Sequence, residues 1–501
     1  MSSSSSLLKL LFTHPDDFRV LLQFKLFYEQ KRDLTAIHEH PTSGWDRRSM
    51  RRCWEFLDMT SRSFSAVIKE LDGDLARVIC IFYLVLRGLD TVEDDMTIPD
   101  AIKQPILRSF HIHTVTPGWT FDGCGPNEKD RQLLVEYDVV VEELNRLKPG
   151  YRDVIVEICE KMQTGMADFA HKAASTGEIY LEKIEDWDLY CHYVAGLVGE
   201  GLSRLLAASG KEPKWMADQL ELSNSMGLFL QKTNIIRDYR EDVEQRRFFW
   251  PKEIWTRESY SVNGHGAFKE MKEMYAPENE KQALWVLSGL VVDVLRHAPD
   301  CLDYLRLLKN QSAFNFCAIP QVMAIATINV VFMNPQTFQR NIKIRKAEAV
   351  ALIMKATNPR DVAYLFRDYA RRIHVKADPQ DPNFLKLSIS CGHIEMWCEL
   401  SYPSFVSAPS QPGQGPLIDL NDRRSTVIAL DEKRDKELLE LQKLAKATGG
   451  KVKDVVRQGV KTTKKETHWD LISFMVFSMV AVLGLGLGVS WFVIPKLVPD
   501  S

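Results

Sequence analysis

The chain has 501 residues, of which 45% are hydrophobic, and this is sufficient for a large buried core. Its 64 basic and 67 acidic residues give a formal net charge of −3 at pH 7. Such a balance produces no general basic field, so nucleic acid is not an expected partner, and any anionic ligand must be held by local clusters.

Nine cysteines, an odd number, occur without a C-x-x-C pair and without histidines at zinc-ligand spacing. This usage predicts free thiols in a reducing compartment. The N-terminal sequence MSSSSSLLKLLF has no basic n-region, and Lys9 interrupts its short apolar run, so it does not predict a secretion signal. We therefore expect the chain to begin in the cytosol, with residues 1–35 as an N-terminal segment.

The apolar residues from about position 18 to position 400 recur mostly at helical spacing, without the sustained alternation typical of a sheet. The predicted body is all-α, with a catalytic domain over residues 36–400 and surface loops over residues 111–129 and 259–282. Small hydroxyl residues in TSRSFS, residues 60–65, predict a helix start. Arg62 in this segment is a candidate anion ligand, and a surface arginine explains it equally well.

The stretch YLVLRGLDTVEDD, residues 83–95, places acidic side chains on one face of an otherwise apolar helix. We call Asp90, Glu93 and Asp94 the first acidic motif, and Arg87 lies on the same face. Burying unpaired like charges costs several kcal/mol for each ion, so packing alone does not explain them. A cation is expected to face this motif.

The stretch QKTNIIRDYRED, residues 231–242, repeats the spacing D-x-x-E-D. We call Asp238, Glu241 and Asp242 the second acidic motif, and Arg237 lies beside it. Two matching helix faces predict one site between two facing helices. Carboxylate oxygens without histidine or cysteine partners favour Mg²⁺, whose coordination substrate phosphates usually complete. A pair of solvated acidic helix starts is the alternative, and the duplication within apolar runs argues against it.

Between the two motifs, residues 186–204 form a helical segment that is rich in glycine, with Gly196, Gly199 and Gly201. Each glycine costs a helix up to about 1 kcal/mol relative to alanine, so we expect bulk to be excluded here either by close helix packing or by a long ligand. Tyr190 and Tyr193 lie three residues apart and share a face. They are either a phenol near an apolar channel or ordinary hydrogen-bonded core residues.

Three later stretches carry further signals. Residues 244–250, EQRRFFW, suit either a flap that closes on an anion or a simple turn. Residues 314–327, FNFCAIPQVMAIAT, are apolar and rich in small residues, and they predict either plain core or a groove that a proline kink widens. Residues 341–346, NIKIRK, place Lys343 and Arg345 where they can hold a 2′-phosphate or a diphosphate.

The C-terminal part differs in composition. Residues 401–470 are predicted to be a linker with a short amphipathic helix. Residues 471–494 contain no charge, and as a helix they would be about 36 Å long, enough to cross a hydrocarbon core of roughly 30 Å. They predict a transmembrane anchor, for which a buried core helix is the alternative. Basic residues concentrate before it, which places the catalytic part in the cytosol and residues 495–501 in the lumen.

Four stretches together carry a family resemblance: YLVLRGLDTVEDD, YCHYVAGLVG, SMGLFLQKTNIIRDYRED and QSAFNFCAIPQVMAIAT. In this order, and followed by a tail anchor, they resemble the eukaryotic squalene synthase family, in particular its fungal members. The resemblance covers roughly residues 40–400 and implies the isoprenoid synthase fold, a helical bundle with a central cavity. It also implies a monomeric catalytic domain, held by the tail at the endoplasmic reticulum membrane.

The activity implied is that of a farnesyl-diphosphate farnesyltransferase dependent on Mg²⁺ and NADPH. Two farnesyl diphosphates are joined head to head into presqualene diphosphate, which is then rearranged and reduced to squalene for sterol biosynthesis. The alternatives are a non-reductive head-to-head prenyl synthase of the phytoene or dehydrosqualene type and, more remotely, a non-catalytic tail-anchored protein with a metal-dependent docking surface. The anchor and the NIKIRK cluster favour the reductive enzyme.

The resemblance also implies roles for individual residues. Tyr190 matches the proposed base of the first half-reaction, and Phe316 with Cys317 matches the lining of the second-step pocket. The residues implied to bind Mg²⁺ and diphosphate are Asp90, Glu93, Asp94, Asp238, Glu241 and Asp242. Those implied to hold diphosphate or the phosphates of NADPH are Arg62, Arg87, Arg237, Lys343 and Arg345. The loop over residues 111–129 and the insertion around Gly264 depart from the family pattern, so no role is carried over for Lys129.

Overall fold

The computed structural model describes residues 13–29, 32–61, 63–176, 178–260 and 267–403, with Lys433, Lys436 and Glu440. The chain divides into two compact units, residues 1–29 with 461–501 and residues 30–460. In the described part of the first unit, α2 (Pro15–Gln23) runs into the π-helix η1 (Phe24–Tyr28). Arg62 and the predicted anchor over residues 471–494 lie outside the described residues, as does nearly all of the predicted linker.

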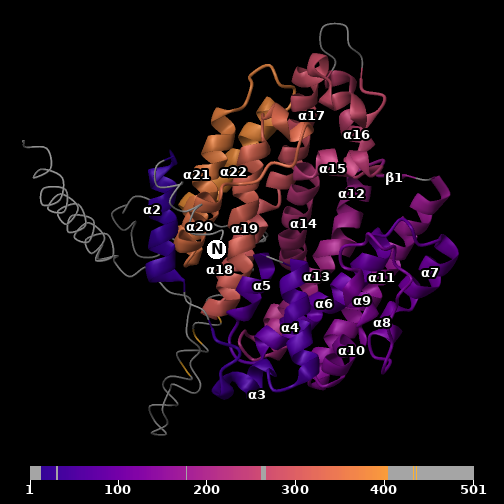
Figure 1. Ribbon diagram of the computed structural model, residues 1–501. Helices are drawn as coiled ribbons and strands as arrows, with labels where there is room; N and C mark the ends of the chain where they lie inside the picture. Colours follow the sequence, from indigo (N-terminus) through magenta and orange to yellow (C-terminus); the bar gives the residue numbers. More distant parts are fainter. Residues whose placement is uncertain are drawn as a thin grey trace, which may run out of the picture. The chain divides into compact units, whose positions relative to one another are not determined.

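The regular secondary structure in the described part of the second unit is helical, apart from one pair of very short strands (Figure 1). Its first helices are α3 (His40–Ser43), α4 (Arg48–Ser61), α5 (Ser63–Lys69), α6 (Leu75–Asp94), α7 (Asp100–Arg108), α8 (Phe110–His113), α9 (Arg131–Val135), α10 (Asp138–Asn145) and α11 (Pro149–Thr176). The later ones are α12 (Ile184–Cys191), α13 (Leu197–Ala208), α14 (Leu220–Arg237), α15 (Tyr239–Glu244), α16 (Lys252–Trp255), α17 (Glu280–Leu295), α18 (Ala298–Leu307), α19 (Gln311–Val331), α20 (Lys346–Lys355), α21 (Pro359–Val375) and α22 (Phe384–Ser401). The helical prediction is confirmed for these residues.

Short 3₁₀ and π turns join several of these helices. They are η2 (Ile37–Glu39), the π-helix η3 (His192–Gly196), η4 (Lys214–Asp218), η5 (Glu258–Tyr260), η6 (Met271–Tyr275), η7 (Pro277–Asn279) and η8 (Pro335–Phe338). The segment over residues 111–129 is largely irregular after α8, and residues 259–282 carry three 3₁₀ turns before α17 begins. Both agree with the predicted loops.

The strands of the described part are β1 (Ile179–Tyr180) and β2 (Arg247–Phe248), which pair in parallel. The sequence analysis did not predict them, because a strand of two residues has no periodicity to detect. They join the chain before α12 to the chain after the second acidic motif. The structure thereby fixes the course of residues 244–250, which the sequence left open.

Helix α14 is central to the second unit, because it packs against α12, α13, α17, α18 and α19. Helix α6 packs against α4, α5, α7 and α11. Helix α19 is the described helix that is long and apolar enough to cross a membrane, yet 67% of its most apolar window is buried inside the protein. It is therefore mostly buried, in agreement with the core interpretation of residues 314–327, and Phe316, Cys317 and Pro320 of this stretch also line a cavity.

Glycines in α13 and α14 allow the backbone of α14 to come into direct contact with α13 and the turn that precedes it. A Cβ atom at Gly199 would lie 2.2 Å from the carbonyl oxygen of Ser223, and one at Gly227 would lie 2.3 Å from the carbonyl oxygen of Ala195. Real Cβ atoms do not approach a backbone oxygen so closely. Of the two explanations left open for the glycine-rich segment, close helix packing is the one that these contacts support.

We expect Gly199→Ala to lower the free energy of unfolding by about 1–3 kcal/mol, because α13 and α14 must separate to admit the methyl group. The matched control is Gly392→Ala in α22, where nothing lies within 4 Å of the added Cβ. That substitution should be neutral or stabilising by up to about 1 kcal/mol, since alanine is the better helix former. Urea unfolding of the two variants measures both effects, and equal stability would contradict the close-packing explanation.

Candidate functional site

A cavity of about 290 Å³ lies between α6, α13, α14 and α19. Its walls are largely apolar and include Ile79, Phe82, Leu86, Met162, Val198, Leu202, Met226, Leu230, Phe316 and Cys317. Its polar lining includes Arg87, Asp90, Gln231 and Asn234, which belong to the helices that lead into the two acidic motifs. The cavity thus combines an apolar chamber with an ionic border.

The first acidic motif occupies the last turn of α6. Asp90, Glu93 and Asp94 each offer a carboxylate oxygen, and these atoms lie within 4.8 Å of one another. Arg87 forms an ion pair of 2.5 Å with Asp90, and Lys103 donates a hydrogen bond of 2.8 Å to the backbone carbonyl of Glu93. The donor set is made only of hard oxygens, which is the chemistry that Mg²⁺ requires, so these residues fit that ion.

Burial makes the charged form of this motif unfavourable. It raises the pKa of Asp90 to about 6, with a further contribution from Asp94 and opposition from Arg87. Burial also raises the pKa of Glu93 well above its usual value, and the charges of Asp94 and Asp90 add to this effect. Asp94 itself is exposed, but desolvation of Asp90 and Glu93 together with the repulsion from Asp94 favours the binding of a cation.

The second acidic motif differs in geometry from the prediction. Helix α14 ends at Arg237, Asp238 leaves the helix with φ −91° and ψ 10°, and α15 begins at Tyr239. The expectation that all three acids lie on one face of a continuous helix is therefore wrong, because the break turns Glu241 to solvent while Asp242 stays buried. Arg237 donates two hydrogen bonds, of 2.8 and 2.6 Å, to the carboxylate of Asp238.

Arg247 connects the two motifs. One guanidinium nitrogen lies 2.9 Å from Asp94 and another lies 2.9 Å from Asp242. Burial raises the pKa of Asp242 to about 7, although the charge of Arg247 opposes the shift. The two motifs therefore do face each other, as their matching patterns predicted. Arg247 itself was not predicted from the sequence, in which the only indication of a role for it was the charged-then-aromatic order of EQRRFFW.

The NIKIRK segment begins beside the second motif, where the amide of Asn341 donates a hydrogen bond to Asp238. Lys343 and Arg345 follow in irregular chain and are exposed. In the sequence, these two cations therefore follow shortly after a residue that contacts Asp238 of the second acidic motif. Asn341 is a second residue that the sequence analysis missed, because a lone asparagine carries no pattern.

Tyr190 lies near the end of α12 and is 6% exposed. Its ring stacks on Phe249 at 4.8 Å and meets the edge of Phe169 at 5.2 Å. Burial raises its pKa well above the usual value, and the charges of the first acidic motif raise it further. Any cation that neutralises this motif makes the loss of a proton from Tyr190 easier.

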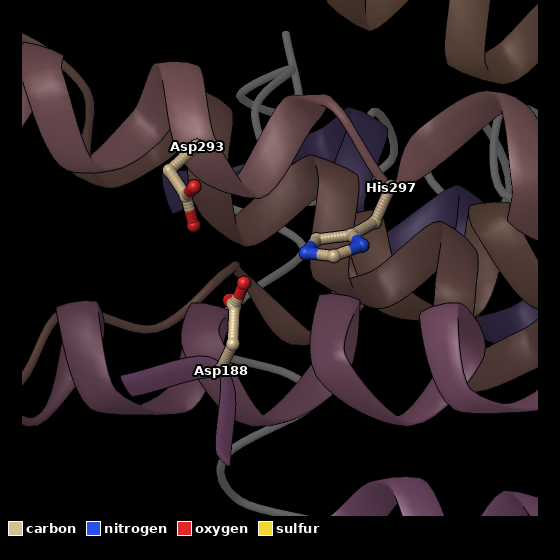
Figure 2. Close-up of side chains that lie close together, drawn as sticks. All are labelled: Asp188, Asp293 and His297. Atoms are coloured by element: carbon tan, nitrogen blue, oxygen red, sulfur yellow. The ribbon is translucent and has the colours of Figure 1, made fainter. Parts of the chain in front are cut away.

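A second cluster with metal-ligand composition lies elsewhere, where Asp188 of α12 points toward Asp293 of α17 and toward His297 (Figure 2). Lys232 of α14, whose side chain is 0% exposed, pairs with both aspartates and lies 3.4 Å from the histidine ring. Arg296 pairs with the same two aspartates at 2.5 and 2.8 Å. Two carboxylates thus face two basic side chains. The charges are balanced, which makes this a structural ion network between helices.

We expect Lys232→Met to reduce the free energy of unfolding by about 3–5 kcal/mol, because it leaves two aspartates without a buried counter-ion. Lys272→Met is the matched control, since Lys272 is 61% exposed and its ion pair among the described residues is with Glu270. It should change stability by less than about 1 kcal/mol. Chemical unfolding compares the two, and a small effect at position 232 would contradict the structural role.

The family model described as Squalene/phytoene synthase matches residues 57–348. A squalene synthase of Ganoderma lucidum is 65% identical over 444 residues, which cover 88% of this chain and 95% of the relative. One of Schizosaccharomyces pombe is 47% identical over 441 residues, covering 86% and 90%. The solved structure "The complex structure of TcSQS with ligand, E5700" matches with a TM-score of 0.65 at 39% identity, covering 70% of this chain and 98% of that one.

Proposed function

We infer the activity of this chain from its family: it belongs to the squalene/phytoene synthases. The relatives that it matches over most of their length are squalene synthases. The chain is therefore a squalene synthase, with the helical fold of that group. We propose that it joins two farnesyl diphosphates into presqualene diphosphate and then reduces this intermediate with NADPH. The observation that best supports this activity is the meeting of two acidic motifs at the border of an apolar cavity.

The acidic motifs and their arginines are proposed to hold the diphosphate groups. Asp90, Glu93 and Asp94 would bind Mg²⁺ on one side, with Asp238 and Asp242 facing them. When bound, Mg²⁺ neutralises the negative charge that develops on the departing diphosphate. Arg87 and Arg237 already lie within these motifs and would add fixed positive charge beside the phosphate oxygens.

The cavity is proposed to hold the farnesyl chains and to keep water away from the allylic cation, which water would otherwise convert to an alcohol. Its largely apolar wall supports this role. The Tyr190 oxygen is proposed to act as the base: as a phenolate, after its own proton has been lost to solvent, it takes up the proton that is lost when the cyclopropane ring closes. Its stacking on Phe249 holds the ring in one orientation.

The reductive step is proposed to occur where Phe316 and Cys317 line the cavity. Lys343 and Arg345 would hold phosphates of NADPH, and the contact of Asn341 with Asp238 supports a location beside the site. When bound there, NADPH would supply the hydride that reduces the carbocation left after loss of the second diphosphate, and the products would be NADP⁺, diphosphate and squalene.

Incubation of the full chain in detergent with farnesyl diphosphate and Mg²⁺, with and without NADPH, tests the proposal. Chromatography of the extracted products should show presqualene diphosphate without NADPH and squalene only with it. A hydrocarbon formed equally in both reactions would instead indicate a non-reductive synthase of the phytoene or dehydrosqualene type.

We further propose that residues 471–494 anchor the enzyme in the endoplasmic reticulum membrane, with the catalytic part, as a monomer, on the cytosolic side. The apolar product and the 24 uncharged residues support this placement. A tagged chain truncated after residue 470 should appear in the soluble fraction after lysis, whereas the full chain should require detergent. Equal solubility of the two would contradict the anchor.

A further inference from the structure

Arg247 is placed by backbone and ring contacts that do not involve the acidic motifs. Its strand β2 pairs with β1, and the neighbouring Phe248 stacks on Tyr180 at 4.5 Å. On the other side, Phe249 stacks on Tyr190. The backbone of Arg247 is therefore held on both sides, while its long side chain reaches to Asp94 and Asp242.

The guanidinium occupies one oxygen of each of two carboxylates that are proposed to bind metal. Asp94 Oδ1 and Asp242 Oδ1 each accept a charged hydrogen bond of 2.9 Å from it. A divalent cation that binds these same oxygens repels the guanidinium and competes with its hydrogen bonds. Arg247 and the metal therefore exclude each other at this pair of carboxylates.

Displacement of the Arg247 guanidinium from Asp94 and Asp242 is unfavourable unless another anion binds it. Its side chain is 19% exposed, and moving a largely buried cation away from its counter-ions leaves the charge uncompensated. Its Nε–H is buried and finds no acceptor among the residues that the structure describes. The Nε–H group of Arg247 can therefore donate a hydrogen bond to an incoming oxyanion. Diphosphate offers oxygens in the geometry that a guanidinium binds best.

The other arginines of the site do not share this position. Arg87 pairs with Asp90 three residues along the same helix, and Arg237 pairs with the adjacent Asp238. Arg87 also lies 3.9 Å from Asp130, outside both motifs, but neither of these arginines pairs with the opposite motif, whereas Arg247 pairs with both. An exchange of partners at Arg247 is therefore the change that would couple the two motifs to each other.

We propose that Arg247 is an exchangeable counter-ion of the two acidic motifs, which makes the binding of divalent metal depend on diphosphate. This inference rests on the proposed function, since it assumes that metal and diphosphate share the site. Metal alone must displace the arginine without compensation. Metal with diphosphate gives the arginine a new partner, so each ligand strengthens the binding of the other.

The test is the affinity of the full chain in detergent for Mn²⁺, measured by electron paramagnetic resonance with and without inorganic pyrophosphate. Titrations without protein correct for the metal that pyrophosphate itself binds. For the unmodified chain, we expect pyrophosphate to tighten metal binding by about 10-fold or more. In Arg247→Gln, metal alone should bind more tightly than in the unmodified chain, and the effect of pyrophosphate should fall to less than about 3-fold.

Arg296→Gln is the matched control, because Arg296 also pairs with two aspartates but lies in the separate cluster of Asp188 and Asp293. It should keep the full effect of pyrophosphate. Should Arg247→Gln not fold, as judged by circular dichroism, Arg247→Lys serves instead. Lysine keeps the charge but lacks the planar, forked set of N–H donors. We therefore expect pyrophosphate to tighten metal binding in this variant by an intermediate factor.

Equal metal affinity with and without pyrophosphate in the unmodified chain would overturn the inference. The same holds if either Arg247 variant keeps the full effect. Because the readout is binding rather than turnover, the proposed function can fail separately: a chain that shows the coupling but makes no squalene would refute the activity and leave the inference standing.

Discussion

Asp90→Asn is expected to lower the rate of squalene formation by at least about 10²-fold, because it removes one carboxylate from the first acidic motif and leaves the shape of the side chain unchanged. Asp90 lies closest to the cavity within that motif, lining it beside Arg87. Its replacement weakens the attraction for metal at the point where the diphosphate would leave. The measurement is the initial rate from farnesyl diphosphate, Mg²⁺ and NADPH.

Loss of activity should not be accompanied by loss of stability. Burial raises the pKa of Asp90 to about 6, so at neutral pH the folded protein holds a charge that burial disfavours. A neutral asparagine removes this cost, and we expect the melting temperature to stay the same or rise. Asp153→Asn on α11 is the control, because Asp153 is exposed, and it should leave both rate and melting temperature unchanged. A normal rate in Asp90→Asn would remove this motif from the chemistry.

Tyr190→Phe is expected to reduce the formation of presqualene diphosphate by about 10²–10⁴-fold, the range of general acid–base catalysis. The ring contacts with Phe249 and Phe169 do not need the hydroxyl, so the fold should persist. The affinity for a non-reacting farnesyl thiodiphosphate in the presence of Mg²⁺ should change little. The loss should therefore appear in kcat rather than in KM.

Tyr193→Phe provides the comparison for Tyr190. Tyr193 lies three residues later, in the π-helix η3, and its ring packs over Gly165. Its hydroxyl has no proposed role, so this variant should turn over at nearly the normal rate. Similar rates for both variants would show that the Tyr190 hydroxyl is not the base, and a large rise in KM for Tyr190→Phe would indicate a role in binding.

The helical body could be predicted because helix formation follows from the local spacing of apolar residues. Val154, Ile158, Met162 and Met166 are spaced four residues apart, which is typical of one face of a helix, and this stripe is buried along α11. The break at Asp238 could not be predicted in this way. It depends on how residues after α14 turn toward β2, and the spacing of the acidic residues is the same with or without it.

The candidate site was only partly accessible to sequence reasoning. Both acidic motifs were recognisable because their repeated spacing is local. Arg247, Lys232 and Asn341 were missed, since each is a single polar residue whose partners lie on other elements. Lys232 illustrates the difficulty: its neighbours in the sequence are ordinary, but its ammonium group meets Asp188 and Asp293 from two other helices.

The sequence by itself determined the helical class, the two acidic motifs, the glycine-rich segment and the family resemblance, because each is written in residues close to one another along the chain. Only the tertiary structure decided that Arg247 spans the two facing motifs, and that the Asp188 cluster is neutralised by Lys232 and Arg296. The physical reason is that electrostatic energy depends on distance in space and on burial. Both are set by how distant segments pack, and neither is visible in local spacing.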